Sequence, residues 1–213
     1  MNNDSSTAEA TINAAITEFV RHGYEHAQVG VDKQELYAQA VSTCMEAITP
    51  PADALRMDSP IPAECMAHIV SAVYTQLDSH RDAVALLAAE SLHPVLEADT
   101  ASAMMESSEL GLHLDRVLLR GQEAGAFRPG ISAQDVFYVI VALSSFRLNH
   151  RHLLTTTTRV DTLSAANTAG IRRLVVDAVL SFLTSNIPNS VHESYLVASG
   201  EDGASSGLGV YWD

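Results

Sequence analysis

Residues 132–185 constrain the fold most, because they contain two long apolar stretches with helical spacing. Ser132 and Asp135 have the spacing of a capping box, which predicts that a helix begins there. The apolar residues that follow cover more than one face of this helix: Val136, Phe137, Val139, Ile140, Val141, Leu143, Phe146 and Leu148. Such a helix is buried on several sides, or is buried on one side and paired with a partner on another.

A second helix is predicted from about Thr162 to residue 185. Its apolar and small residues recur every three or four positions and form one wide stripe, comprising Leu163, Ala166, Gly170, Ile171, Leu174, Val175, Ala178 and Phe182. The small residues would let another helix approach closely. Two interpretations stay open: an ordinary core, or a homodimer interface through residues 132–153 and 162–185 in which one patch meets its own copy.

The remaining sequence predicts further helices and no strand-like alternation, so the expected fold class is all-α. Ser6 and Asp32 each precede a glutamate by three residues, which predicts a capped helix start at both. The first helix should stop near Gly23. Residues 50–62 contain four prolines and should form a loop, and residues 155–161 should connect the last two helices. Other helices are expected from Ala63, over residues 82–92, and from Leu110 to Gly125, whereas residues 95–108 are helical or irregular.

The charge balance disfavours nucleic acid as a partner. The chain has 12 basic and 26 acidic residues, for a net charge of −14, and its first 48 residues hold only Arg21 and Lys33 against seven acidic residues. Nucleic-acid binders usually present a basic face, because neutralising phosphates supplies much of their affinity. No apolar run approaches the roughly 20 residues of a membrane span, and no signal pattern opens the chain, so a cytoplasmic protein is expected. Histidines, cysteines and carboxylates show no metal-ligand spacing, so we expect no metal or other cofactor.

Residues 186–213 differ from the rest, because glycine, serine and aspartate dominate them. This composition predicts a flexible tail, or an arm that wraps around the protein. The apolar Val210, Tyr211 and Trp212 near its end could anchor such an arm in a groove of its own or of a partner subunit.

Three segments resemble the TetR/AcrR family of ligand-controlled repressors. ATINAAITEFVRHGYE (10–25) is similar to the family's first helix, and residues 63–92 are similar to the helix pair that starts its ligand domain. LLRGQEAGAFRPGISAQDVFYVIVAL (118–143) resembles the Arg-Gly-x-x-x-Gly-x-Phe turn before the family's dimer helices. The resemblance covers about residues 7–185 and implies a helical ligand-binding and dimerisation domain.

The chain departs from the family where a helix-turn-helix is expected. That motif needs a second helix, a short turn and a recognition helix, and typical helices have about 11–12 residues. Only Tyr24–Val31 separate the first helix from the next capped start. GVDKQELY (30–37) can be aligned either to the recognition helix or to the start of the following helix, and neither alignment leaves room for the supporting helix. We therefore expect a degenerate DNA-binding region over 1–48, a ligand-binding and dimerisation domain over 49–185, and a tail over 186–213.

The resemblance implies an apolar pocket with a few polar groups for a small, largely apolar ligand. Carried onto this chain, the candidate contacts are Met66, Val70, Tyr74, Leu87, Met104, Leu110, His113, Val117, Phe127, Tyr138, Phe146 and His150. Aromatic residues and methionines at this spacing are also ordinary core residues. His113 could instead be a core histidine bonded to a backbone carbonyl, and Glu90 is either a buried hydrogen-bonding carboxylate or a solvent-facing one.

Three functions fit these observations. The first is a receptor that has lost conventional DNA binding and acts through a partner, such as a full-length TetR-like relative. The second is an enzyme that uses His113 and Tyr138 for acid–base chemistry, such as elimination, isomerisation or cyclisation. The third is a transcriptional repressor with an unusual DNA contact, which the acidic N-terminal segment disfavours most.

Overall fold

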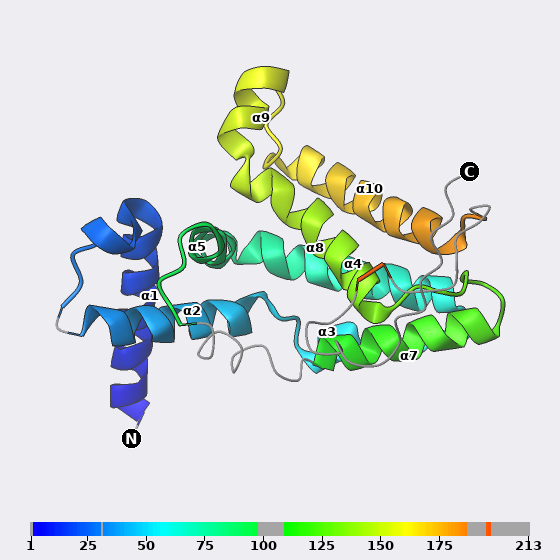
Figure 1. Cartoon of the computed structure of the whole chain (residues 1–213), viewed down its shortest axis with the longest axis horizontal. Coiled ribbons are helices and arrows are strands. Elements are labelled where there is room, and N and C mark those ends of the chain that lie inside the picture. Colours follow the sequence, from blue (N-terminus) through cyan, green and yellow to red (C-terminus); the bar gives the residue numbers. More distant parts are fainter. Residues whose placement is uncertain (1, 31, 98–108, 187–194, 197–213) are drawn as a thin grey trace, which may run out of the picture.

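The computed structural model describes residues 2–30, 32–97, 109–186 and 195–196, and its regular secondary structure in these ranges is entirely α-helical (Figure 1). The predicted all-α class is therefore confirmed. The helices are α1 (Asn2–His26), α2 (Lys33–Ile48), α3 (Ala52–Leu55), α4 (Pro62–Ser79), α5 (Arg81–Leu92), α7 (Glu109–Glu123), α8 (Ala133–Asn149), α9 (Arg151–Thr158) and α10 (Ala165–Thr184).

The main hydrophobic core surrounds α4, which packs against α7, α8 and α10. Figure 1 shows α4 between α7 on one side and the α8–α10 pair on the other. The stripe predicted from the spacing of apolar residues is buried in this core, and comprises Met66, Ile69, Val70, Val73, Tyr74 and Leu77. Pro62 occupies the first turn of α4, where its missing amide proton costs no helical hydrogen bond.

A second hydrophobic cluster joins α1, α2 and α5. Its centre is aromatic: the Tyr37 ring packs edge-on against Phe19 and Tyr24, with centroid distances of 4.9 Å to each. The backbone of α1 is not helical at Gly23, which is where the sequence predicted that the first helix ends. The φ of Gly23 is 70°, a left-handed value that glycine tolerates better than other residues do. Because α5 belongs to this cluster, apolar packing does not divide at residue 48.

Two predicted capping boxes were wrong, and one is confirmed. The α1 backbone is already helical from Asn2, so Ser6 does not begin the helix. Asp32 precedes α2 with a left-handed φ of 64° and makes no side-chain cap. At α8, in contrast, the Ser132 hydroxyl accepts from the Asp135 amide and the Asp135 carboxylate accepts from the Ser132 amide. The difference is the backbone of the capping residue, which is extended at Ser132 as a cap requires.

Two predicted connections contain helices. The loop predicted over 50–62 includes the single turn of α3, and the connection predicted over 155–161 is helical up to Thr158. The threonine side chains of α9 fit a helix because they bond back to carbonyl oxygens four residues earlier, as Thr156 does to His152 at 2.8 Å. The last helix begins at Ala165, capped by Ser164, and not at Thr162.

Two residues of the predicted tail, Tyr195 and Leu196, lie against the start of α8. Their backbone amides donate to the Asp135 carboxylate at 3.3 and 2.9 Å. The Arg128 guanidinium stacks over Phe182 and donates to the Tyr195 hydroxyl at 3.3 Å. Met104, Val210, Tyr211 and Trp212, which the sequence analysis singled out, lie outside the described residues.

Candidate functional site

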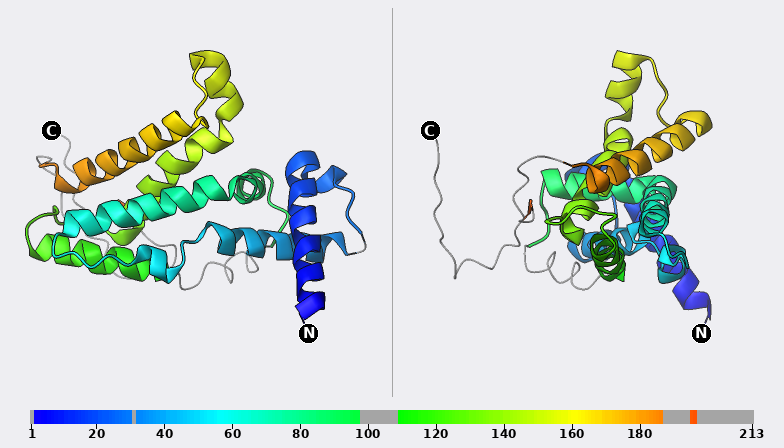
Figure 2. Two further views of the ribbon diagram at one scale, coloured as in Figure 1. Left: turned by 180° about the vertical axis from the view of Figure 1, so that it is seen from behind. Right: turned by 90° about the vertical axis from the view of Figure 1, so that its right-hand side faces the viewer.

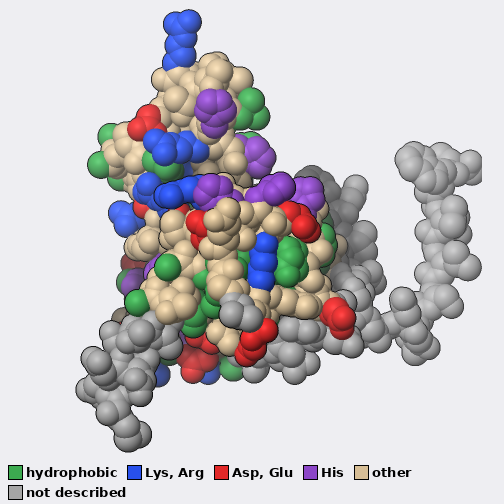
Figure 3. All heavy atoms as spheres, turned by 90° about the vertical axis from the view of Figure 1, so that its left-hand side faces the viewer, with side chains coloured by type: hydrophobic (Ala, Val, Ile, Leu, Met, Phe, Trp, Pro, Cys, Tyr) green, Lys and Arg blue, Asp and Glu red, His purple; other side chains and the backbone are tan. Residues whose placement is uncertain are grey.

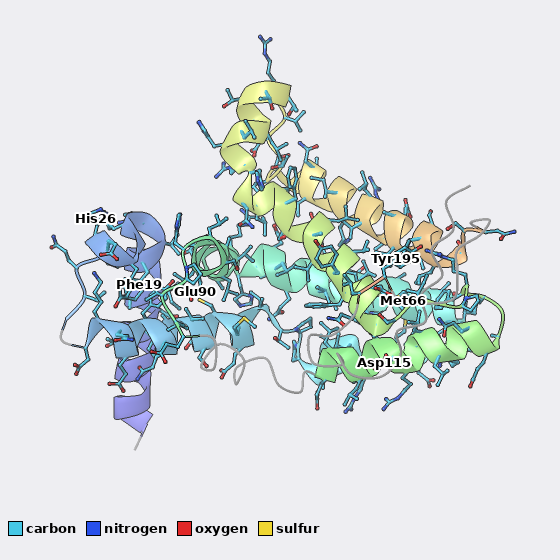
Figure 4. The ribbon with its side chains drawn as sticks, viewed as in Figure 1. Phe19, His26, Met66, Glu90, Asp115 and Tyr195 are labelled. Atoms are coloured by element: carbon cyan, nitrogen blue, oxygen red, sulfur yellow. The ribbon has the colours of Figure 1, made fainter. Side chains whose placement is uncertain are left out.

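Five of the predicted ligand contacts lie together in the main core. Met66, Val70 and Tyr74 come from α4, Leu110 from α7, and Phe127 from the turn before α8, and all five are almost completely buried. Figure 4 shows Met66 between the ribbons of α4, α7 and α8. The partly buried Val117 packs against this group. The sequence therefore identified residues that share one interior, although their role as ligand contacts stays a prediction.

A charged cluster crosses this interior where α4, α8 and α10 meet. The Arg147 side chain is only 4 % exposed, and its guanidinium pairs with the Asp78 carboxylate. The same guanidinium stacks on the Tyr74 ring, 4.7 Å from its centroid, and donates to the Thr162 carbonyl at 3.2 Å. The Tyr74 hydroxyl donates to the Thr168 carbonyl at 2.9 Å, which ties α4 to α10. Burial raises the pKa of Tyr74, and the positive charge of Arg147 opposes part of that rise.

Several polar atoms around this cluster are buried without a hydrogen-bond partner among the described residues. They are Arg147 Nε and the hydroxyl oxygens of Ser144, Thr162 and Thr168. Buried polar groups are normally hydrogen-bonded, to protein, to water or to a ligand. The cluster can therefore supply an N–H donor and three hydroxyls, within an otherwise apolar interior. We call Tyr74, Asp78, Ser144, Arg147 and Thr162, with Thr168, the junction cluster.

Sequence reasoning found only Tyr74 of the junction cluster. The available signal was Arg147 itself, an arginine near the end of a strongly apolar helix. A buried arginine needs a counter-charge, so its presence on an apolar stripe predicts a carboxylate partner from another element. Asp78 could not be identified in this way, because it lies near the end of α4 and the residues around it predict only that the helix ends there.

The other predicted contacts lie outside the junction cluster. Leu87 packs in the second hydrophobic cluster with α1 and α2. Tyr138, Phe146 and His150 are exposed along the outward side of α8, where the Phe146 and His150 rings stack at 4.3 Å.

His113 bonds to its own helix. Its Nδ1 lies 2.9 Å from the Glu109 carbonyl oxygen, one turn earlier in α7, and the ring is partly exposed. Within the described part of the chain, no hydrogen bond joins His113 to Tyr138. The geometry thus agrees with a backbone-bonded histidine and offers no support for an acid–base pair.

Glu90 is a hydrogen-bonding carboxylate of the second cluster. It accepts from the Tyr37 hydroxyl at 2.9 Å and from the amides of Val95 and Leu96, so it closes the end of α5 (Figure 4). Burial, and then the hydrogen bond and charge of Glu90, raise the pKa of Tyr37 well above its usual range. Burial, with a smaller effect of Asp82, raises the pKa of the Cys44 thiol to about 11.

Two hollows lie near the N-terminal helices, and none of the predicted ligand contacts lines either one. A groove of about 580 Å³ separates α1, α2 and the α4–α5 turn, with Asn13, Cys44, Asp78 and Asp82 on its walls. A shallower hollow of about 490 Å³ lies between α2 and Leu96, with Asp32, Glu35 and Glu97 around it. No group of three or more histidines, cysteines or carboxylates among the described residues could hold a metal ion.

The outward side of α8 and α10 carries large apolar side chains that remain exposed among the residues the structure describes. Phe137, Tyr138 and Phe146 of α8 are 38 %, 64 % and 51 % exposed, and Leu174 of α10 is 59 % exposed. The apolar stripe predicted for the last helix therefore divides, because Val175 is buried while Leu174 is exposed. Tyr138 and Phe146 are eight residues apart and so lie on the same side of α8, and large exposed apolar side chains of this kind mark a surface that can bind another protein.

Comparison with known proteins places the main core in a described family. The family model for the tetracyclin repressor-like C-terminal domain matches residues 62–179, which is more than half of the chain. A solved structure of a mutant HlyIIR protein shares 16 % identity with a TM-score of 0.49, over 85 % of this chain and 98 % of that chain. A comparison with curated proteins gives no match.

Proposed function

The chain belongs to the TetR family, and on this premise we propose that it is a dimeric, ligand-responsive regulator that acts without a conventional helix-turn-helix. Proteins of this family typically dimerise and bind small molecules. No described helix is long and apolar enough to cross a membrane. The observation that carries the proposal is the connection between α1 and α2, which is short and is held against α1 by hydrogen bonds.

Residues 27–32 are all that separate α1 from α2. A supporting helix and a recognition helix would need several times that length. The ends of the connection are also fixed: the Gln28 amide donates to Glu18 at 3.0 Å, and Lys33 donates to the Glu25 carbonyl at 3.1 Å and lies over the Tyr24 ring. These contacts hold the connection against α1, and this supports the loss of the DNA-reading element.

The test of this loss is selection from a random DNA library at low salt, with a TetR-family repressor that has a complete helix-turn-helix as the positive control. We expect no enriched sequence motif and no saturable, salt-dependent binding, because the α1–α2 unit carries more acidic than basic residues. An enriched motif bound by this protein would contradict the proposal and restore the repressor hypothesis.

We propose that the uncovered face of α8 and α10 forms the homodimer interface. Tyr138→Glu or Leu174→Glu should weaken the dimer at least tenfold, because each places a charge where an exposed apolar side chain would be buried against the partner. Analytical ultracentrifugation measures the dimer dissociation constant. Leu112→Glu is the matched control, since Leu112 is 65 % exposed on α7 and should not affect dimerisation.

We further propose that a small, largely apolar ligand binds at the junction cluster. The support is an apolar interior that contains unpartnered hydroxyls and one N–H donor, which could orient such a ligand. Host extract incubated with the protein and analysed by mass spectrometry should yield a compound that co-elutes unchanged. Ser144→Ala with Thr162→Val should reduce its recovery, whereas the exposed Thr75→Val in α4 should not. A compound that disappears while a product accumulates would favour the enzyme hypothesis.

A further inference from the structure

The α9 helix projects from the molecule, and none of the described residues buries it. Figures 1 and 2 show α9 standing beyond the ends of α8 and α10, away from the core. None of its residues is buried, and its main contact is with the end of α8. Leu153, one of its two leucines, is 57 % exposed.

A helix of this length and composition is not stable by itself in water. Isolated helices shorter than about 12–15 residues are marginal even when rich in alanine. The α9 helix has eight residues, and four of them are threonines, whose branched side chains are poor helix formers. The described residues give α9 little packing, so its sequence and structure together favour contact with a partner.

Exposed apolar side chains continue along the chain from α8 into α9. Tyr138 and Phe146 are exposed on α8, and Leu153 follows on α9 after the bend at His150. A partner that covers the α8 face is then the nearest candidate to cover α9 as well. This continuity favours a second copy of the chain.

The charge of this end complements the rest of the chain. The segment that contains α9, residues 150–161, holds Arg151 and Arg159 against Asp161, so its formal charge is +1 and that of the remaining chain is −15. Figure 3 shows arginine and histidine side chains gathered toward the projecting end, with most acidic side chains of that view below them. A basic arm is attracted to the acidic body of a second copy, and this attraction weakens as salt screens it.

We propose that α9 is an arm that docks on the acidic body of the partner subunit, with Leu153 as its apolar contact and Arg151 and Arg159 as its charged contacts. This inference rests on the proposed dimer and adds a second contact to it. The arm lies flat against the partner and becomes ordered when the dimer forms.

Charge reversal tests the arm without touching the α8–α10 face. Arg151→Glu with Arg159→Glu should weaken the dimer about tenfold at low salt and reduce the salt dependence of its dissociation constant. Arg21→Glu with Arg116→Glu is the matched control, because these arginines are exposed elsewhere and give the same change in net charge. An equal effect of the two pairs would overturn the proposal.

Cross-linking identifies directly which molecule α9 contacts. Cys44 and Cys65 are buried, so Leu153→Cys provides the accessible thiol for a maleimide photo-cross-linker. In a mixture of isotopically light and heavy protein, we expect cross-links between light and heavy copies at peptides rich in aspartate and glutamate. Cross-links confined to one copy would overturn the proposal, as would nucleic-acid binding that the Arg151 and Arg159 reversals abolish while the dimer is unchanged.

Tyr138→Glu separates this inference from the proposed dimer interface. If Tyr138→Glu leaves the dimer intact, the α8–α10 interface is wrong. If Tyr138→Glu dissociates the dimer but the arm reversals and the Leu153→Cys cross-link have no effect, only the arm is wrong. Amide hydrogen exchange of α9 should be slow in the dimer and fast in the Tyr138→Glu monomer.

Discussion

Gly121 shows how a single residue fixes the turn before α8. Its carbonyl accepts from the amides of Ala126 and Phe127 at 2.8 and 3.0 Å, and Gly125 turns the chain with a φ of 66°. The Phe127 ring lies so close to Gly121 that a Cβ there would overlap the ring. The glycine spacing that carried the family resemblance is therefore a packing requirement.

Gly121→Ala should destabilise the protein by about 1–3 kcal/mol, because the added methyl group forces Phe127 out of the core. Urea unfolding followed by circular dichroism measures the loss. Gly30→Ala is the control, since Gly30 has open space around its Cβ position and no left-handed φ. Equal stability of the two variants would show that the turn can relax around the methyl group.

The Tyr37 hydroxyl should make stability fall at alkaline pH. Its pKa is raised in the folded protein, whereas in the unfolded chain it is about 10, so above pH 10 the unfolded chain loses a proton that the folded protein retains. The contribution of Tyr37 to the free energy of unfolding is therefore fully present below pH 10 and is lost as pH rises further.

Urea unfolding of Tyr37→Phe at pH 8 to 11 tests this linkage. The loss of unfolding free energy between pH 9 and 11 should be smaller in Tyr37→Phe than in the natural chain. A remaining decrease is expected from Cys44 and Tyr74, whose pKa values are also raised. Identical slopes in the two proteins would exclude Tyr37 as a source of the alkaline instability.

At the scale of elements, the Asp135 carboxylate accepts more hydrogen bonds than a helix cap alone requires. It completes the capping box of α8, and it also accepts from the amides of Tyr195 and Leu196. Ser132→Ala should cost about 1 kcal/mol, as for other caps. Asp135→Ala should cost more, about 1–3 kcal/mol, because additional amides lose their acceptor.

Thermal unfolding should rank the variants in that order, with Ser164→Ala at α10 as the mildest, since its cap bond is longer at 3.4 Å. A chain ending at residue 194 refines the interpretation: it should be less stable than the natural chain, and Asp135→Ala should cost less in that background. Equal costs in both backgrounds would mean that residues 195–196 contribute nothing through Asp135.

Helices with a clear apolar stripe could be predicted from the sequence, whereas a helix without such a stripe, such as α9, could not. The α4 stripe and the Ser132 cap could be read from spacing, because burial and capping act between residues three or four apart. The end of α9 was missed because it consists of four consecutive threonines, a residue type that favours extended structure. Asp32 was misjudged because the capping pattern says nothing about its left-handed backbone.

The candidate site was less accessible to sequence reasoning than the fold. Burial of Met66, Val70 and Tyr74 follows from periodicity, but the pairing of Asp78 with Arg147 joins residues 69 positions apart. Nothing local to either residue indicates the other. For His113 the sequence left two interpretations open, and the bond of its ring to the Glu109 carbonyl agrees with the interpretation of a histidine bonded to the backbone.

At the scale of the whole molecule, the two hydrophobic clusters should unfold together. Adjacent residues of α5 belong to different clusters, Val84 to the main core and Ala83 to the second cluster. Leu114→Ala in the main core and Phe19→Ala in the second cluster should each lower one shared transition in calorimetry, at a cost of about 2–5 kcal/mol. Two separate transitions in either variant would show that the clusters are independent.

The position of α5 between the two clusters also restricts how the chain can change in length. Inserting or deleting one residue in a helix turns everything beyond it by about 100°. Val84 of α5 packs in the main core and Leu86 of α5 packs in the second cluster. Such a change in α5 would move these side chains away from their clusters. Among natural relatives, insertions and deletions should therefore occur before residue 81 or after residue 92, and the length of this helix should be kept.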